Sequence, residues 1–195
     1  MQAFEASDTG LRARLVDVGV ELVAREGVQA LTLREIARRA GVSHGAPRRY
    51  FPTHLELLSA IARRGFEELG ARVSAVTGDG GAPPREQLTE LGWAYLEFAL
   101  GNPGMYELMF RHDLLESGHL GLRDTSLPLF ARLVDLVGRV RPDADPRLVA
   151  GALWAGLHGI AQLWGWGSLQ LATGAEDFAP LLRAVLDAHL GPEDG

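Results

Sequence analysis

The chain has 195 residues, of which 47% are hydrophobic and 23% charged, as in ordinary globular proteins. It contains no cysteine, which excludes disulfides, cysteine-based zinc sites and cysteine nucleophiles; with no signal-peptide pattern, this favours a cytoplasmic location. The net charge of −6 is uneven: residues 11–64 hold ten Arg against five acidic residues, and residues 65–195 hold nine Arg against eighteen. The basic N-terminal third predicts a surface suited to a polyanion.

Helical spacing of apolar residues dominates the chain and strand patterns are sparse, so the sequence predicts an all-α protein. Residues 1–10 are short, polar and acidic and predict a flexible tail. Apolar residues three to four apart, from Leu11 to Leu22, form one stripe of a first helix. This helix is predicted to end at Gly27, a residue typical of helix C-termini.

A second helix is predicted to begin at a capping box, in which Thr32 caps the helix and Glu35 reaches back to Thr32. It ends at Gly41, because a sharp turn needs a residue that enters positive φ at little cost. Ser43 then caps a third helix that reaches about Tyr50. Two such helices form a helix-turn-helix, whose second helix enters the major groove of DNA with its N-terminus first.

The start of the third helix would therefore meet base edges, and the backbone N–H groups near Ser43 favour a phosphate oxygen. The base-facing residues are His44, Gly45 and Ala46. Because Gly45 and Ala46 have almost no hydrogen-bonding capacity, readout would also depend on methyl contacts and DNA shape.

Proline at position 52 ends the third helix, and the remaining chain reads as further helices. A fourth helix is predicted from about residue 53 to 76, before a loop rich in glycine and proline at 77–84. Later helices are predicted near 85–101, 104–116, 124–140, 145–166 and 176–190.

The ordered segments Leu31-Thr32-Leu33-Arg34-Glu35-Ile36-Ala37, Gly41-Val42-Ser43, Arg49-Tyr50-Phe51-Pro52 and Leu57-Leu58 resemble the TetR family of repressors. The resemblance implies an all-helical dimer whose three N-terminal helices bind double-stranded DNA. The rest of the chain would form a helical bundle that binds a small-molecule effector and the partner subunit, without a cofactor. The predicted organisation is a tail at 1–10, a helix-turn-helix domain at 11–54 and an effector-binding and dimerisation domain at 55–195.

Carried over by position, the resemblance gives Arg34 a base or phosphate contact, and gives phosphate contacts to Arg48, Arg49 and Tyr50. The chain departs from the family at Pro47, where an aliphatic residue is common, at Arg48, where Tyr is frequent, and at His54, where a phosphate-binding Lys is usual. The predicted DNA-binding set is Thr32, Arg34, Ser43, His44, Gly45, Ala46, Arg48, Arg49, Tyr50 and His54.

A weaker resemblance covers the C-terminal half, where Trp154 with His158-Gly159 is similar to a family subgroup marked by a Trp…His-Gly signature. In that subgroup the domain binds a small, often apolar effector. The predicted pocket residues are Trp93, Phe98, Met105, Tyr106, Met109, Phe110, Trp154 and His158. Taken singly, each is more typical of a hydrophobic core, whereas the cluster favours a pocket. His158 has no second His, no Cys and no carboxylate within one turn, so neither a metal site nor a catalytic site is predicted.

Residues 148–172 hold no charged side chain, which leaves a membrane span or a buried interface open. The stretch is rich in glycine and is broken at residues 165–167, and Gly151, Ala155 and Gly159 form a seam of small residues. These features favour a homodimer interface over a membrane span, with helices near 145–166 and 176–190 pairing across a two-fold axis.

The sequence thus predicts a DNA-binding transcriptional regulator, a repressor released from a palindromic operator by a small, largely apolar effector. Two alternatives keep the DNA-binding chemistry: an activator, and a regulator without an effector. A third is an all-helical enzyme that contains a helix-turn-helix, although the sequence has no recognised catalytic motif.

Overall fold

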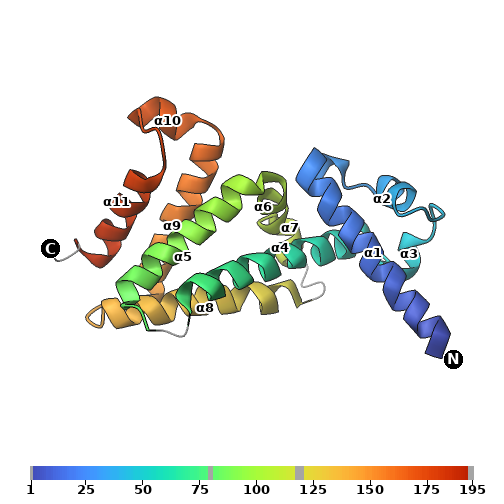
Figure 1. Ribbon diagram of the computed structural model, residues 1–195, viewed down its shortest axis with the longest axis horizontal. Helices are drawn as coiled ribbons and strands as arrows, with labels where there is room; N and C mark the ends of the chain where they lie inside the picture. The colour runs from blue at the N-terminus through green and yellow to red at the C-terminus, as the bar shows by residue number, and fades with distance from the viewer. Residues whose placement is uncertain (1, 79–80, 117–120, 193–195) are drawn as a thin grey trace. The chain divides into compact units, whose positions relative to one another are not determined.

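The computed structural model describes residues 2–78, 81–116 and 121–192, and these contain helices and no strand, which confirms the all-α fold (Figure 1). The elements are α1 (Gln2–Glu26), the 3-10 helix η1 (Val28–Ala30), α2 (Leu33–Arg39), α3 (Pro47–Tyr50), α4 (His54–Thr77), α5 (Pro84–Gly101), α6 (Pro103–Met109), α7 (His112–Glu116), α8 (Leu122–Val140), α9 (Pro146–Gly165), α10 (Ser168–Thr173) and α11 (Ala179–Leu190).

The chain forms two compact units, Met1–Glu67 with Asn102–Thr125, and Glu68–Gly101 with Ser126–Gly195. The sequence predicts a boundary between residues 54 and 55 and places the segments of α6 and α7 in the second domain. In the structure α6 packs against α1 and η1 and so belongs to the first unit. The approach is close, because a Cβ on Gly104 would lie 2.5 Å from the carbonyl oxygen of a residue in α1.

The core of the first unit combines apolar residues from α1, α2 and α4 with the segment between α3 and α4. Leu15, Leu22, Ile36, Phe51 and Ile61 have no exposed surface. The apolar stripe predicted for the first helix is therefore a core stripe. The structure also includes residues 2–10 in α1, where the sequence predicted a tail.

In the second unit α9 packs against both α5 and α11, and glycines bring the helices close together. A Cβ on Gly92 of α5 would lie 2.7 Å from Leu182 of α11. A Cβ on Gly156 of α9 would lie 2.8 Å from Val185 of α11. Substitution at either glycine would force a neighbouring side chain to move, so these residues set the spacing of the core helices.

Two differences from the predicted helices concern breaks in the chain. The helix predicted at 104–116 divides into α6 and α7, and Arg111 at the break binds Asp113 in the first turn of α7. The stretch without charge at 148–172 divides at Gly167, whose φ is 75°, and continues as the unpredicted α10. No helix within the described ranges has the length and apolar composition needed to cross a bilayer.

Candidate nucleic-acid interface

The turn after α2 follows the predicted geometry. α2 ends at Arg39 and is followed by Ala40 at its C-cap, and Gly41 has a φ of 66°, a left-handed conformation that favours glycine. The N–H of Val42 donates to the carbonyl oxygen of Ala37 at 3.0 Å, which closes the turn. The guanidinium of Arg14 in α1 donates to the carbonyl of Ala40, so the end of α2 is held by the first helix. The turn is therefore fixed from both sides.

The start of α2 confirms half of the predicted capping box. Thr32 Oγ1 accepts a hydrogen bond from the N–H of Glu35 at 3.2 Å. The second half is wrong, because the Glu35 carboxylate does not turn back to Thr32 but accepts hydrogen bonds from Arg38 and Arg39 at 2.6 and 2.7 Å. These bonds lower the pKa of Glu35 to about 2. The carboxylate thus ties down the two cations at the end of α2.

The third helix starts three residues later than predicted, at Pro47 rather than just after Ser43. A helix capped by Ser43 would take its first backbone hydrogen bond from the N–H of residue 47, and proline has none. The N–H of Ala46 instead donates to Ser43 O at 2.9 Å in a tight turn, and no side chain caps α3. Pro47 itself is buried at the first position of the helix, where proline is well tolerated.

Most arginines of residues 11–64 have partners within the protein. Arg12 lies 4.9 Å over the Phe51 ring, Arg14 binds the carbonyl of Ala40, Arg38 and Arg39 bind Glu35, Arg63 binds Glu67, and Arg64 binds Asp17. Within the described part of the chain, the four without an ion pair, a hydrogen bond or a ring contact are Arg25, Arg34, Arg48 and Arg49. Three of these four belong to the helix-turn-helix. The charge count could not make this distinction, because it depends on tertiary contacts.

The structure brings the predicted DNA-binding residues onto α2, the turn and α3. The side chains of Arg34, His44, Arg48 and Arg49 are exposed, and Tyr50 is half-buried. Gly45 is exposed, and a Cβ built on it would meet nothing within 4 Å. This short segment can therefore approach another molecule closely without steric hindrance from its own chain.

His54 differs from these exposed residues because its side chain is hydrogen-bonded within the protein. Its Nε2 lies 2.6 Å from the carbonyl oxygen of Leu31, so Nε2–H donates there and links the start of α4 to the segment before α2. The neighbouring Thr53 caps α4, because its Oγ1 accepts from the N–H of Glu56 at 3.1 Å. The geometry gives His54 a structural bond that the sequence analysis missed, since the bonded residues are 23 positions apart.

The predicted effector residues fall into two groups, one in each unit. Met105, Tyr106, Met109 and Phe110 belong to the first unit, where both methionines pack against the backbone of Gly65 in α4. The Phe110 ring lies 5.7 Å from Phe66 of α4. This group fills the space beside α4 with closely packed side chains.

The second group, in α5 and α9, is joined by hydrogen bonds. Trp154 Nε1–H donates to the Tyr95 hydroxyl at 3.3 Å, and that hydroxyl lies 3.1 Å from His158 Nδ1. Since the hydroxyl accepts from Trp154, it donates its own proton to His158. Burial lowers the pKa of His158, which agrees with a neutral ring that accepts at Nδ1. Phe98 is buried in the same unit, with Arg72 over its ring at 5.5 Å.

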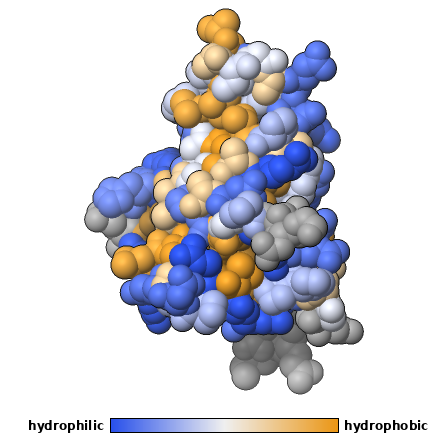
Figure 2. Space-filling model, turned by 90° about the vertical axis from the view of Figure 1, so that its left-hand side faces the viewer, coloured by the Kyte–Doolittle hydropathy of each residue, from blue (hydrophilic) through white to orange (hydrophobic). Residues whose placement is uncertain are grey.

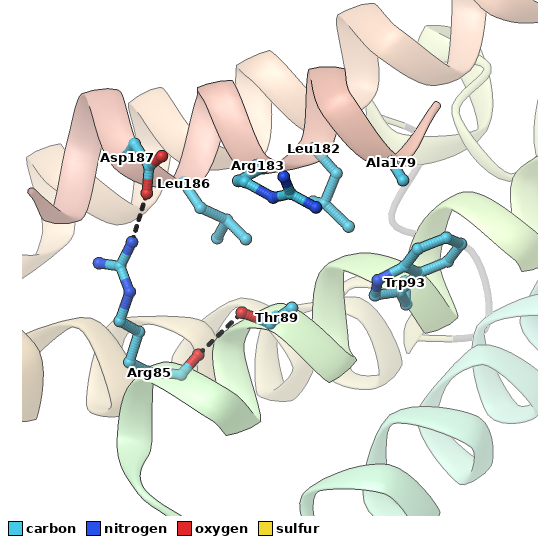
Figure 3. A pocket seen from close by; sticks show the side chains of 8 residues that line it. All are labelled: Arg85, Thr89, Trp93, Ala179, Leu182, Arg183, Leu186 and Asp187. Atoms are coloured by element: carbon cyan, nitrogen blue, oxygen red, sulfur yellow. Dashed lines mark hydrogen bonds and ion pairs between the residues drawn. The ribbon is translucent and has the colours of Figure 1, made fainter. Parts of the chain in front are cut away.

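A hollow between α5 and α11 includes the last predicted residue, Trp93 (Figure 3). Its floor is formed by Leu182 and Leu186, and an ion pair between Arg85 and Asp187 at 2.5 Å closes one end. Trp93 stands at the other end, with its ring 4.7 Å from Phe178. The remaining lining residues are Thr89, Ala179 and Arg183.

Helices α2 and α3 are joined by a fixed turn at a glycine and carry three exposed, unpaired arginines. This arrangement is that of a DNA-binding protein of the helix-turn-helix class. Residues 15–61 match the family model for bacterial regulatory proteins of the tetR family, and residues 88–189 match the tetracyclin repressor-like C-terminal domain. The chain belongs to the TetR family of transcriptional regulators.

Individual relatives agree with this assignment. The HTH-type transcriptional repressor Rv3405c of Mycobacterium tuberculosis is 28% identical over 93% of this chain and 81% of its own. A protein of unknown function from Rhodococcus sp. RHA1 aligns with a TM-score of 0.79 and 26% identity, over 92% of this chain and 93% of that one. The multidrug binding protein EbrR aligns with a TM-score of 0.63 and 25% identity, over 94% and 96%.

TetR-family regulators bind DNA and small-molecule ligands and act as dimers, and they are not enzymes. Membership therefore removes the alternative of an all-helical enzyme. The subgroup with the Trp…His-Gly signature stays a prediction.

Proposed function

We propose that the protein is a repressor that binds a palindromic operator as a homodimer and is released by a small, largely apolar effector. Each subunit contributes α2, the turn and α3, so a two-fold dimer requires two inverted half-sites. The homodimer interface consists of α9 and α11. The effector must bind the DNA-free state more tightly than the DNA-bound state, because equal affinity for both would shift nothing.

The observation that supports this proposal most strongly is that some arginines of the helix-turn-helix are ion-paired within the protein and others are not. Arg34, Arg48 and Arg49 are exposed and unpaired, whereas Arg38 and Arg39 beside them are ion-paired with Glu35, and Arg39 is also paired with Glu26. A free guanidinium is permanently charged, and its fork matches phosphate oxygens. Arg48 and Arg49 therefore supply phosphate contacts, and Arg34 reaches a base edge or a phosphate.

Base selection comes from the turn. His44 is the residue there with hydrogen-bonding capacity toward a base edge, while Gly45 and Ala46 permit close approach and methyl contacts. His54, held by Leu31, sets the position of α4 against the motif and contributes a phosphate contact only through its remaining ring nitrogen.

An effector of mainly apolar character suits the aromatic residues of the second unit. Tyr95, Trp154 and His158 form a connected polar group among apolar neighbours, which could orient one polar atom of a ligand. The EbrR structure, solved with imidazole, supports a small organic ligand in a relative of this chain.

The test is fluorescence anisotropy of the purified protein on duplex DNA from the region upstream of its gene, with random duplex as reference. The double variant Arg48→Ala/Arg49→Ala should lose binding, and its salt slope should fall by about one for each lost phosphate contact. The matched control is Arg25→Ala/Arg139→Ala, which removes the same charge from exposed positions outside the helix-turn-helix and outside α9 and α11.

Equal losses in both double variants would contradict a specific role of α3. Binding to random duplex alone would direct the search to another operator through random-site selection. Apolar compounds that raise the melting temperature should then be added to the DNA complex: release supports a repressor with an effector, and tighter binding supports the activator alternative. A screen without any hit favours a regulator without an effector.

A further inference from the structure

The hollow between α5 and α11 has a lining of mixed polarity that the proposed function does not use. Its volume is about 100 Å³, and it is partly open to solvent (Figure 3). Arg85, Thr89 and Trp93 line it from α5, and their spacing of four residues places them on one side of that helix. Leu182 and Leu186 line it from α11 with the same spacing. The hollow is therefore a groove between two facing helix sides.

The hollow is separate from the polar group formed by Tyr95, Trp154 and His158. Tyr95 follows Trp93 by two residues, which is a turn of about 200° around a helix with 3.6 residues per turn. The hydrogen bonds of Tyr95 connect it to α9, whereas Trp93 faces the hollow at α11. A ligand in the hollow would therefore occupy a second site, on the other side of α5 from the one proposed for the effector.

The charges of the hollow favour an anion. Its lining holds two arginines and one aspartate, although residues 65–195 as a whole are acidic. Arg85 is ion-paired with Asp187 at 2.5 Å, so one guanidinium of the hollow already holds a carboxylate. Arg183 has no ion pair or hydrogen bond within the described ranges, and Figure 3 shows its side chain running along α11 toward the Trp93 end. Its guanidinium is free to bind a second carboxylate.

The apolar part of the lining favours an aromatic ring on that anion. Trp93 stands at the end toward which Arg183 runs, and an aromatic ring can stack against an indole. Leu182 and Leu186 form an apolar floor beside it. Figure 2, a view from the side of Figure 1 on which α11 lies, shows hydrophilic and hydrophobic residues side by side on this face. A ligand with one charged end and one apolar end matches both features.

We propose that the hollow between α5 and α11 binds a small aromatic carboxylate with a single ring. The carboxylate pairs with Arg183, because the guanidinium fork matches two carboxylate oxygens. The ring lies against Trp93 and over Leu182. The volume limits the ligand to one ring, since a closed apolar cavity of about 150 Å³ holds one benzene and this hollow is smaller but open on one side. The site requires neither the homodimer nor release from an operator, so each proposal can fail without the other.

The test is a titration of 4-fluorobenzoate with the purified protein at neutral pH, followed by fluorine NMR. The dissociation constant should be about 1 mM or lower, in keeping with a ligand of ten non-hydrogen atoms. The neutral compound 4-fluorobenzamide has the same ring and should bind at least about fivefold more weakly, because it lacks the charge. Equal binding of the two compounds, or no detectable binding of 4-fluorobenzoate, would overturn the proposal.

Substitution of Arg183 tests whether the carboxylate binds in the hollow. Arg183→Gln should raise the dissociation constant of 4-fluorobenzoate about fivefold or more and leave that of 4-fluorobenzamide unchanged. Arg139→Gln is the matched control, because it removes the same charge from an exposed position in the same unit. Equal effects of these two variants would overturn the site. Loss of binding in Arg48→Ala/Arg49→Ala would also overturn it, by placing the anion on the helix-turn-helix.

Substitution of Asp187 should have the opposite effect. Asp187→Asn removes the carboxylate that holds Arg85, so the hollow becomes more positive and 4-fluorobenzoate should bind about threefold more tightly. A purely structural role of this ion pair predicts weaker binding instead. Asp135→Asn, at an exposed position of α8, is the matched control and should change the affinity by less than roughly twofold. Weaker binding in Asp187→Asn would contradict the proposed charge recognition.

The contact with the ring is tested at Trp93. Trp93→Leu should weaken both compounds by a similar factor, because it removes the stacking surface without changing charge. Trp166→Leu is the matched control, since Trp166 is 71% exposed and lies outside the hollow. Unchanged binding of both compounds to Trp93→Leu would contradict an aromatic ligand in this hollow.

Discussion

The helix-turn-helix and the segment formed by α9 and α10 leave opposite kinds of side chain exposed. The first exposes guanidinium groups that have no acidic partner, and the second exposes leucine and tryptophan on a surface without charge. Exposed guanidinium groups are well hydrated, whereas exposed leucine and tryptophan side chains gathered on one surface are unfavourable in water. The difference indicates two separate partners, a polyanion for the first surface and a second copy of the chain for the other.

The largest expected effect comes from a substitution that destabilises the first unit and leaves the second unit intact. Phe51 is fully buried beneath the helix-turn-helix, with Arg12 over its ring. Phe51→Ala should cost about 3–5 kcal/mol of stability through the cavity it leaves. DNA binding should be lost while sedimentation still shows a dimer, because α9 belongs to the other unit. Loss of the dimer as well would mean that the two surfaces are not independent.

A smaller change in stability is expected when two glycines of the helix-turn-helix, four residues apart, are each replaced by alanine. Gly41 has a φ of 66°, so Gly41→Ala should cost about 1–2 kcal/mol for a left-handed conformation. Gly45 is not among the residues with positive φ and has open space around it, so Gly45→Ala should change stability by less than about 0.5 kcal/mol. Urea denaturation of both variants checks this, and a larger cost at Gly45 would contradict the described turn.

These residues also show what sequence can predict. The capping by Thr32, the stop at Gly41 and the limits of α4 follow from local rules, and the structure confirms them. The late start of α3 also has a local cause, because Pro47 lacks an N–H, although the third helix is predicted to begin directly after Ser43.

Contacts between residues far apart in the chain could not be predicted from the sequence. Spacing gives no sign that Arg14 binds the carbonyl of Ala40, 26 residues away, or that Arg38 and Arg39 share one carboxylate. The residues predicted as one effector pocket divide between the two units, with those at 105–110 in the first and those at 93, 98, 154 and 158 in the second. Helical periodicity finds the buried side of each helix but not the neighbour against which it packs.

A third prediction concerns the polar group in the second unit. Tyr95→Phe removes the acceptor for Trp154 and the donor to His158 while keeping the ring. The loss should be about 0.5–1.5 kcal/mol for hydrogen bonds of ordinary strength. Denaturation in urea measures it, and DNA affinity without effector should stay unchanged. A change in that affinity would show that this group acts on the DNA-binding surface even when no ligand is bound.

The smallest effect on stability is expected from Glu35→Gln. This variant tests whether an arginine that loses its ion pair gains affinity for DNA. The variant frees Arg38, and Arg39 keeps its bond to Glu26. One more free cation on α2 should strengthen binding to random duplex and steepen the salt slope by about one. Anisotropy at several salt concentrations measures both.

The same variant has a pH signature. The folded pKa of Glu35 is lowered to about 2 by Arg38 and Arg39, so its ion pairs stabilise the protein above the unfolded value of 4.5. That contribution is lost as the pH falls from 4.5 toward 2, and Glu35→Gln should lack this part of the pH dependence. Glu68→Gln, which removes the ion-pair partner of Arg72 on α4, is the matched control. If both variants steepen the salt slope equally, total charge rather than the helix-turn-helix governs attraction to DNA.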